Sequence, residues 1–282
     1  MKENLTLCLV SSCMLALFLV TGCTKDPATG GESPCQIQKI VIPSHLLVAS
    51  NRVKPIPYIA RNIPYKVQST SNITPGASDT LTFTYNTWRN PVSVTHRMNI
   101  GDNILFKYDK WNRLTEYINI YPGGTGGDYW HKYTYDKVNT DRIIADTAFR
   151  DFISSNGELT FYNDIDLTIF KYDSLGRISQ TTEYVLGNTI VRLYNYDTQG
   201  NLQRPGSLFD NKPNIHLTNK IWMFLDRDYS INNPVDNESY TYNGNGFPIT
   251  INNSASVAPG LGFIVIGYPF AITRASIYYS CP

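Results

Sequence analysis

The chain contains little of what catalytic and metal-binding sites are usually made from. Only four of its 282 residues are histidines, and they are scattered, whereas a zinc site normally includes a closely spaced pair of ligands. Serine and cysteine nucleophile motifs with a supporting histidine are absent. We therefore expect no metal, no cofactor and no catalytic residue of a recognisable type, and the sequence favours a protein that is not an enzyme.

An excess of charge of one sign is also lacking. Lys and Arg total 24 against 23 Asp and Glu, which leaves a net charge of +1. No basic stripe is present, so we expect no nucleic-acid partner. The glycine-rich run 123–127 lacks the Lys-Ser or Lys-Thr of a phosphate-binding loop, and we interpret it as a flexible hairpin loop.

Residues that favour helices, such as Ala and Glu, are sparse, and a repeated motif indicates β-strands instead. Six times the chain has an aromatic residue, any residue, then Tyr followed by Asp or Asn. The copies are 83–86, 106–109, 133–136, 170–173, 194–197 and 240–243. Residues two apart on a strand point to the same face, so each copy places two rings side by side. Spacing between the tyrosines is irregular, from 23 residues (Tyr85 to Tyr108) to 46 (Tyr196 to Tyr242).

Each copy is followed by residues typical of a tight turn. In the copy at Tyr172, the Asp173 carboxylate can accept hydrogen bonds from backbone N–H groups of the turn, and Gly176 can take the positive φ of a three-residue loop with a bulge. The equivalent of Gly176 is Asn or Gly after three other copies: Asn112, Gly200 and Gly246. Two copies depart from the pattern, because Arg89 takes this place after Tyr85 and the turn after Tyr135 is longer. We expect a different geometry in these two turns.

These units predict an all-β fold. The strands should form an antiparallel meander of repeated hairpins, as a rolled sheet or an open or closed barrel-like structure. The one exception is a short helical insertion near 215–230, where apolar side chains fit a helical turn or two.

The first residues have the composition of a targeting segment. An apolar run at 5–20 ends in Val20-Thr21-Gly22-Cys23, which resembles a bacterial lipobox. We predict a signal peptide over 1–22, lipidation of Cys23, a flexible tether over 23–34 and a single β-sheet domain over 35–282. The alternative is an ordinary signal peptide cleaved elsewhere. If Cys23 is lipidated, Cys35 and Cys281 are the remaining cysteines of the mature chain. We predict that they form a disulfide in an oxidising compartment, and the alternative is two free thiols.

Two resemblances extend this interpretation. The units at Phe106 and Phe170 resemble the tyrosine–aspartate (YD/RHS) repeats of large secreted bacterial shell proteins. Each consists of Phe-Lys-Tyr-Asp, two further residues, Asn or Gly, Arg, and Leu or Ile. The whole chain is similar to short lipoproteins of Bacteroidetes-type bacteria that share a domain of unknown function with a porin-like β-fold. The latter resemblance covers roughly 35–282 and includes the lipobox and the stretches 226–234 and 242–248. It implies an outer-membrane lipoprotein, on the periplasmic or cell-surface side, and transfers no catalytic residue.

Candidate functional residues are therefore few. The repeated aspartates are better explained as turn caps than as calcium ligands or glycosidase carboxylates, since a glycosidase needs one facing pair. The aromatic pairs favour a structural ladder over a sugar-binding platform. The possible ligand-contact residues are exposed aromatics in the irregular loops: Tyr129, Trp130, Trp222 and Phe224. The sequence predicts a cell-envelope binding or scaffold module for a glycan, a lipid or another envelope protein, and an envelope hydrolase with a loop-assembled site stays open as the alternative.

Overall fold

The structure used here is a computed structural model. It describes residues 35–43, 78–97, 103–120, 129–150, 152–155, 158–161, 165–204, 206–236, 238–253 and 274–281. These belong to one compact unit, Glu32–Pro282. The predicted signal peptide, Cys23 and the tether lie outside the described residues.

Nearly all of the regular secondary structure in the described residues is β-strand. The strands are β1 (Gln36–Ile42), β2 (Asp79–Tyr85), β3 (Pro91–His96), β4 (Asn103–Tyr108), β5 (Leu114–Ile120), β6 (Tyr129–Tyr135), β7 (Ile143–Arg150), β8 (Phe152–Ser155), β9 (Glu158–Phe161), β10 (Ile165–Tyr172), β11 (Ile178–Val185), β12 (Asn188–Leu193), β13 (Phe209–Pro213), β14 (Asn232–Pro234), β15 (Glu238–Tyr242), β16 (Pro248–Asn253) and β17 (Arg274–Ser280).

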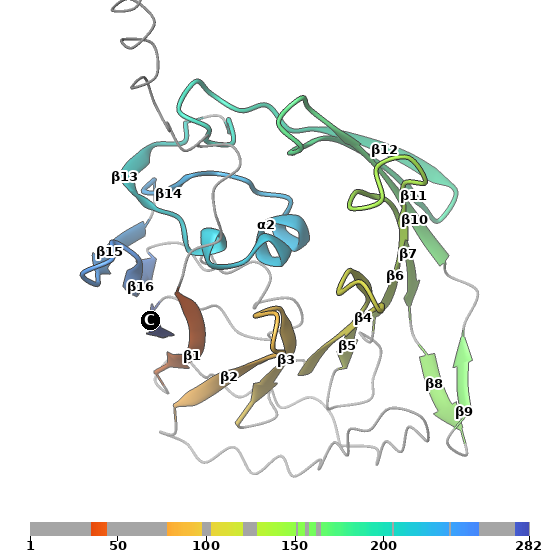
Figure 1. Ribbon diagram of the computed structural model, residues 1–282, viewed down its shortest axis with the longest axis horizontal. Coiled ribbons are helices and arrows are strands. Elements are labelled where there is room, and N and C mark those ends of the chain that lie inside the picture. The colour runs from red at the N-terminus through yellow and green to blue at the C-terminus, as the bar shows by residue number, and fades with distance from the viewer. Residues whose placement is uncertain are drawn as a thin grey trace, which may run out of the picture. The chain divides into compact units, whose positions relative to one another are not determined.

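Thirteen of these strands form one antiparallel sheet (Figure 1). Their order is β12-β11-β10-β7-β6-β5-β4-β3-β2-β1-β17-β16-β15, and the hairpins β8-β9 and β13-β14 are separate. Neighbours in the chain are mostly neighbours in the sheet, so the predicted meander of hairpins is confirmed. Among the described strands, β12 and β15 are edges and do not pair with each other, which makes the sheet open rather than closed.

The fifth repeat unit, at 194–197, departs from the other five. Its turn closes as expected, with Asp197 N–H bonded to Asn201 O at 2.9 Å. Beyond the turn, the chain makes only an isolated bridge between Tyr196 and Leu202 and then leaves the sheet. The incoming strand β12 therefore has no outgoing partner strand in its hairpin.

The predicted helical insertion is confirmed as a 3₁₀ turn, η3 (Ile215–Thr218), followed by helix α2 (Lys220–Asp226). Asn219 caps α2, because its side-chain oxygen accepts a hydrogen bond from Ile221 N–H at 2.9 Å. The helix ends at Arg227, which takes the left-handed conformation with φ of 54°.

The main core lies between α2 and the inner face of the sheet (Figure 1). Trp222 of α2 is completely buried, and its ring meets those of Phe83 and Phe106 edge-on at centroid distances of 5.8 and 5.7 Å. In β2 the large residues alternate with threonines, so that Leu81 and Phe83 point inward while the threonines between them face outward. This period of two buries one face of the β2-β3 hairpin against α2.

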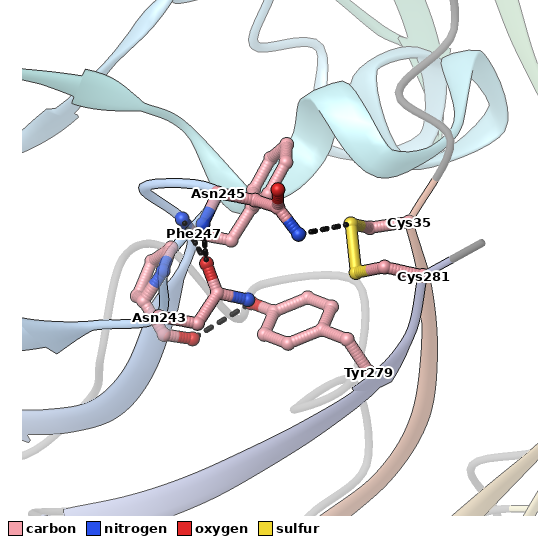
Figure 2. Close-up of a disulfide and its surroundings, with 7 residues drawn as sticks. Cys35, Asn243, Asn245, Phe247, Tyr279 and Cys281 are labelled. Carbon is pink, nitrogen blue, oxygen red and sulfur yellow. Dashed lines mark hydrogen bonds between the residues drawn. A yellow bond between two sulfur atoms is a disulfide. The ribbon is translucent and has the colours of Figure 1, made fainter.

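A disulfide joins the first strand of the sheet to the last (Figure 2). Cys35 and Cys281 are bonded at an S–S distance of 2.02 Å, next to the antiparallel pair β1-β17. The Asn245 side chain donates a hydrogen bond to the Cys35 sulfur at 3.5 Å, which ties the turn of the last repeat unit to the bridge. Because the bridge closes a loop of 246 residues, the chain-entropy account predicts stabilisation by several kcal/mol.

Candidate functional site: the groove beside the hairpin turns

The turns have the geometry that the repeat predicts. Asp173 Oδ1 accepts hydrogen bonds from the backbone N–H groups of Leu175 and Arg177, both at 2.9 Å, and its Oδ2 accepts one from Arg177 Nε at 2.8 Å. Gly176 has a φ of +79°, and the strand register shifts by a bulge between Lys171 and Tyr172. One carboxylate thus holds both the loop backbone and the side chain of the residue that precedes the next strand.

The turn after Tyr108 repeats this arrangement with Asn112 in the left-handed position, at φ of 60°. Partial burial alone would raise the pKa of Asp109 and Asp173. The hydrogen bonds and charges of Arg113 and Arg177 outweigh burial, so the pKa of each carboxyl is lowered and both groups stay ionised.

The expectation of a different geometry after Tyr85 is wrong. Arg89 has a φ of 65°, and Asn86 Oδ1 accepts hydrogen bonds from Trp88 N–H and Asn90 N–H, both at 3.0 Å. The capping side chain is therefore sufficient to impose the turn on a residue that tolerates it poorly. The turn after Tyr135 does differ, because six positions rather than four separate Asp136 from its hydrogen-bonded partner Arg142.

The second ring of each unit fastens one hairpin to the next. In five units the tyrosine hydroxyl donates to a backbone carbonyl of the neighbouring hairpin, at distances between 2.5 and 3.4 Å. The donor–acceptor pairs are Tyr85–Ile37, Tyr108–Pro91, Tyr135–Leu114, Tyr172–Ile143 and Tyr196–Ile178. These rings are half-buried, whereas the first rings in β2, β4 and β10 are buried. The aromatic pairs therefore form a structural ladder.

Arginine side chains that follow the turns cover the same tyrosines. The guanidinium of Arg113 lies over the Tyr135 ring at 4.5 Å, and that of Arg142 lies over Tyr172 at 5.0 Å. Such cation–π contacts hold the planar groups in place. The rungs at Tyr135 and Tyr172 thus combine a ring face, a guanidinium and an anchored hydroxyl.

A groove of about 460 Å³ runs between these turns and α2. Its lining combines aromatic and apolar side chains with amides and charged groups. The lining residues are Asn90, Trp111, Asn112, Arg113, Leu114, Tyr135, Asn139, Asp141, Arg142, Ile143, Tyr172, Gly176, Lys220, Ile221, Phe224 and Tyr229. This volume and this mixture are typical of a small-ligand site.

The tyrosines of the groove stay protonated at neutral pH. Burial raises the pKa of Tyr135 and Tyr172 well above the usual value of 10, although nearby arginines act in the opposite direction. Their hydroxyls are also engaged with backbone carbonyls, so they are poorly placed to act as acids or bases. The groove offers binding surfaces and hydrogen-bond donors rather than an obvious proton-transfer group.

Exposed apolar side chains occupy the third position of four neighbouring turns. They are Trp88, Trp111, Val138 and Leu175, with exposed fractions of 72, 65, 94 and 47%. Because β2-β3, β4-β5, β6-β7 and β10-β11 are successive hairpins of the sheet, these tips lie along one edge. Of the two tryptophans, Trp111 lines the groove and Trp88 does not.

The four predicted ligand-contact residues do not form one site. Trp222 is buried in the core, so the expectation that it is exposed is wrong, because the insertion folds onto the inner face of the sheet. Phe224 lines the groove and packs against the Tyr133 ring at a centroid distance of 5.3 Å. Trp130 lies on the opposite face of the sheet, where its Nε1 donates to Glu116 Oε2 at 2.9 Å. The side chain of Tyr129 lies outside the described residues.

Three histidine–aspartate pairs were not predicted from the sequence. His96 Nδ1 lies 2.8 Å from Asp79, His131 Nδ1 lies 2.9 Å from Asp146, and His216 Nε2 lies 2.6 Å from Asp226. The β6-β7 register pairs His131 with Ala148, which places Asp146 two residues away on the same face. Hairpin register would have revealed that pair. Within the described ranges, no group of three or more His, Cys, Asp or Glu side chains is placed to hold a metal ion.

Comparison with known proteins identifies no family. No protein-family model matches the chain, and no curated protein matches it. Among solved structures, the chain is similar to the crystal structure of TcdB2-TccC3-Cdc42 (12% identity, TM-score 0.27) and to the Tc holotoxin pore of Photorhabdus luminescens (10% identity, TM-score 0.28). Each match covers 62% of this chain and 9% of the other chain, and at these TM-scores it supports no conclusion about function. Within the described ranges, no helix is long and apolar enough to span a membrane.

Proposed function

We propose that the protein is a lipid-anchored module of the bacterial cell envelope that binds a glycan in the groove beside the hairpin turns. The observation that carries this proposal is the combination of fixed ring faces with hydrogen-bonding groups along one groove of about 460 Å³. Phe224, which the sequence already favoured as a ligand contact, contributes to it.

The chemistry of the lining suits sugar rings. The apolar face of a sugar packs on an aromatic ring, and its hydroxyl groups need donors and acceptors around the rim. Trp111 and Tyr172 offer rings, while Asn112 and Asn139 offer amides that both donate and accept. The tyrosine rings are already fixed by their hydroxyl bonds, which lowers the entropy cost of binding.

Charge favours an acidic glycan over a neutral one. Arg142 and Lys220 line the groove together with one lining carboxylate, Asp141, whereas the guanidinium of Arg113, which also lines it, is already paired with Asp109 at 2.7 Å. Guanidinium groups bind carboxylates through two parallel hydrogen bonds, so a uronic acid or similar sugar is the better partner. Binding should then weaken as salt concentration rises.

The anchor is proposed from the Cys23 motif and from the resemblance to envelope lipoproteins. A diacylglyceryl group and an acyl chain on Cys23 would supply two lipid signals, which is enough for stable attachment to the outer membrane. Mass spectrometry of the N-terminus from native membranes tests this. A mature chain that starts elsewhere and carries no acyl mass would contradict it.

The binding site is tested with two matched tryptophan variants. Soluble protein lacking residues 1–23 is screened against acidic and neutral polysaccharides, and any ligand found is titrated against Trp111→Ala and Trp88→Ala. Both side chains are exposed and occupy the same turn position, but only Trp111 lines the groove. We expect Trp111→Ala to weaken binding about tenfold or more and Trp88→Ala to leave it unchanged, because central aromatic contacts commonly contribute 1–2 kcal/mol or more. Equal binding by both variants, or no retention on any polysaccharide, would refute the proposal.

A further inference from the structure

Strand β12 (Asn188–Leu193) is exposed along its whole length. It lies at one end of the sheet (Figure 1), and all six of its residues are exposed, including Ile190 at 39%, Val191 at 55% and Leu193 at 69%. A long edge strand with apolar side chains and free backbone groups is normally covered, charged or paired with another strand.

The repeat explains why this position is open. In the other five units the strand that carries the aromatic pair is bonded to the strand after its own turn, as β10 is to β11. The fifth unit, at 194–197, makes only the bridge between Tyr196 and Leu202 after its turn. The described part of the sheet therefore lacks one strand where the pattern would place it, beside β12.

The register shows which backbone groups of β12 face this open edge. Val185 pairs with Asn188 across a two-residue turn, and Tyr194 N–H donates to Ser179 O at 2.9 Å. Antiparallel bonds alternate along a strand, so Asn188, Ile190 and Arg192 are bonded to β11. The N–H and C=O groups of the alternate residues, 189, 191 and 193, consequently point outward.

We propose that a second copy of this chain pairs with β12 through its own β12, antiparallel and centred on Val191. The outward-facing residues are symmetric about Val191, because Thr189 and Leu193 lie two positions on either side of it. A two-fold axis at Val191 therefore makes all three residues hydrogen-bonded pairs at once. No other residue of β12 is such a centre.

The side chains are compatible with this register. Val191 meets Val191 of the second copy, and Leu193 meets Thr189, which covers the two most exposed apolar groups of one face. Ile190 lies opposite Arg192 on the other face. The guanidinium of Arg192 is already 3.3 Å from the Glu183 carboxylate, so no two like charges face each other.

Cysteine cross-linking tests the register in the full-length protein in its native membranes. Hydrogen-bonded antiparallel partners have Cα atoms about 5.5 Å apart, which is within disulfide reach. Val191→Cys should therefore give a covalent dimer under a mild thiol oxidant. Thr189→Cys alone should not, because its own counterpart lies four residues along the strand, about 13 Å away. Co-expressed Thr189→Cys and Leu193→Cys chains should cross-link to each other, and wild type is the background control.

A second measurement addresses association without cysteines. Val191→Lys places two ammonium groups opposite each other, and we expect it to convert a dimer of the detergent-solubilised full chain to a monomer by light scattering, while thermal unfolding stays cooperative. Asn195→Lys, an exposed change beyond the strand, is the matched control and should remain dimeric. A monomeric wild type, or equal cross-linking of Thr189→Cys and Val191→Cys, would overturn the proposal. A cross-link to a different protein would assign the edge to another partner and would also refute it.

Discussion

Gly176 gives the sharpest test of the turn geometry. It has a φ of +79°, and a Cβ added there would meet no atom within 4 Å. Any cost of substitution at this position is therefore backbone strain and not a steric clash. The chain already contains the relevant comparison, since Asn112 occupies the same place in another turn at φ of 60°.

The expected order of stability is wild type, then Asn, then Ala, then Val. The left-handed conformation costs a residue with a Cβ about 1–2 kcal/mol, and the lower entropy of the unfolded chain returns about 0.4–1 kcal/mol. Gly176→Ala should therefore lose about 0.5–1.5 kcal/mol of the free energy of unfolding. Gly176→Asn should lose less because Asn tolerates this region, and Gly176→Val should lose about 1–3 kcal/mol.

Urea unfolding followed by tyrosine and tryptophan fluorescence measures these differences. Gly200→Ala is the informative companion, because its φ is +88° and its Cβ would lie 2.6 Å from Ile231 Cδ1. It should cost more than Gly176→Ala by about 0.5–1.5 kcal/mol, which is the expense of moving one side chain off its rotamer. A Gly176→Val protein as stable as wild type, or an equal loss for Asn and Val, would refute the assigned geometry.

Three further predictions follow from single contacts. Tyr172→Phe should destabilise the protein by about 1 kcal/mol, because a backbone carbonyl loses its donor, and thermal unfolding measures the loss. Replacing Cys35 and Cys281 by Ser should cost about 2–5 kcal/mol in urea, and reducing agent should then have no further effect on the variant. Burial would lower the pKa of His216, but the hydrogen bond and charge of its aspartate partner raise it above 6.5. The pair therefore stabilises the fold fully at pH values well below 6.5, and this contribution is lost as pH rises through the folded pKa. The gap in unfolding free energy between wild type and His216→Gln should shrink as pH rises above about 6.5, as urea unfolding at a series of pH values measures.

Most of the fold could be predicted from the repeat. Residues with a period of two predicted the strands, and the Asp or Asn after each tyrosine predicted the turns, because both signals act within a few residues. The geometry of the Arg89 turn was not predicted, because the prediction depended only on the residue type at position 89. The capping bonds of Asn86 decide that geometry instead.

The site depended on contacts that are distant in the sequence. Trp222 looked like a loop residue, and only the docking of α2 against Phe83 and Phe106 shows that it is a core residue. The groove likewise combines turns from four hairpins with a helix that comes later in the chain. Hairpin register was predictable in principle from the turns, but the place of the insertion was not, because no local pattern specifies which strands it covers.

The third turn position is where this fold can change its surface without changing its stability. In the Asp173 turn, the carboxylate accepts a hydrogen bond from the backbone N–H of Leu175, and the Leu175 side chain takes no part in this bond. The same position holds Trp88, Trp111 and, in the fifth unit, Gln199, whose N–H donates to Asp197 at 2.8 Å. Trp88→Gln, Trp111→Gln and Leu175→Gln should therefore each alter the free energy of unfolding by less than about 0.5 kcal/mol, as surface substitutions usually do. A loss of more than about 1 kcal/mol in any of them, by urea unfolding, would show that these side chains also support the turn, and it would weaken the case that their exposure reflects binding.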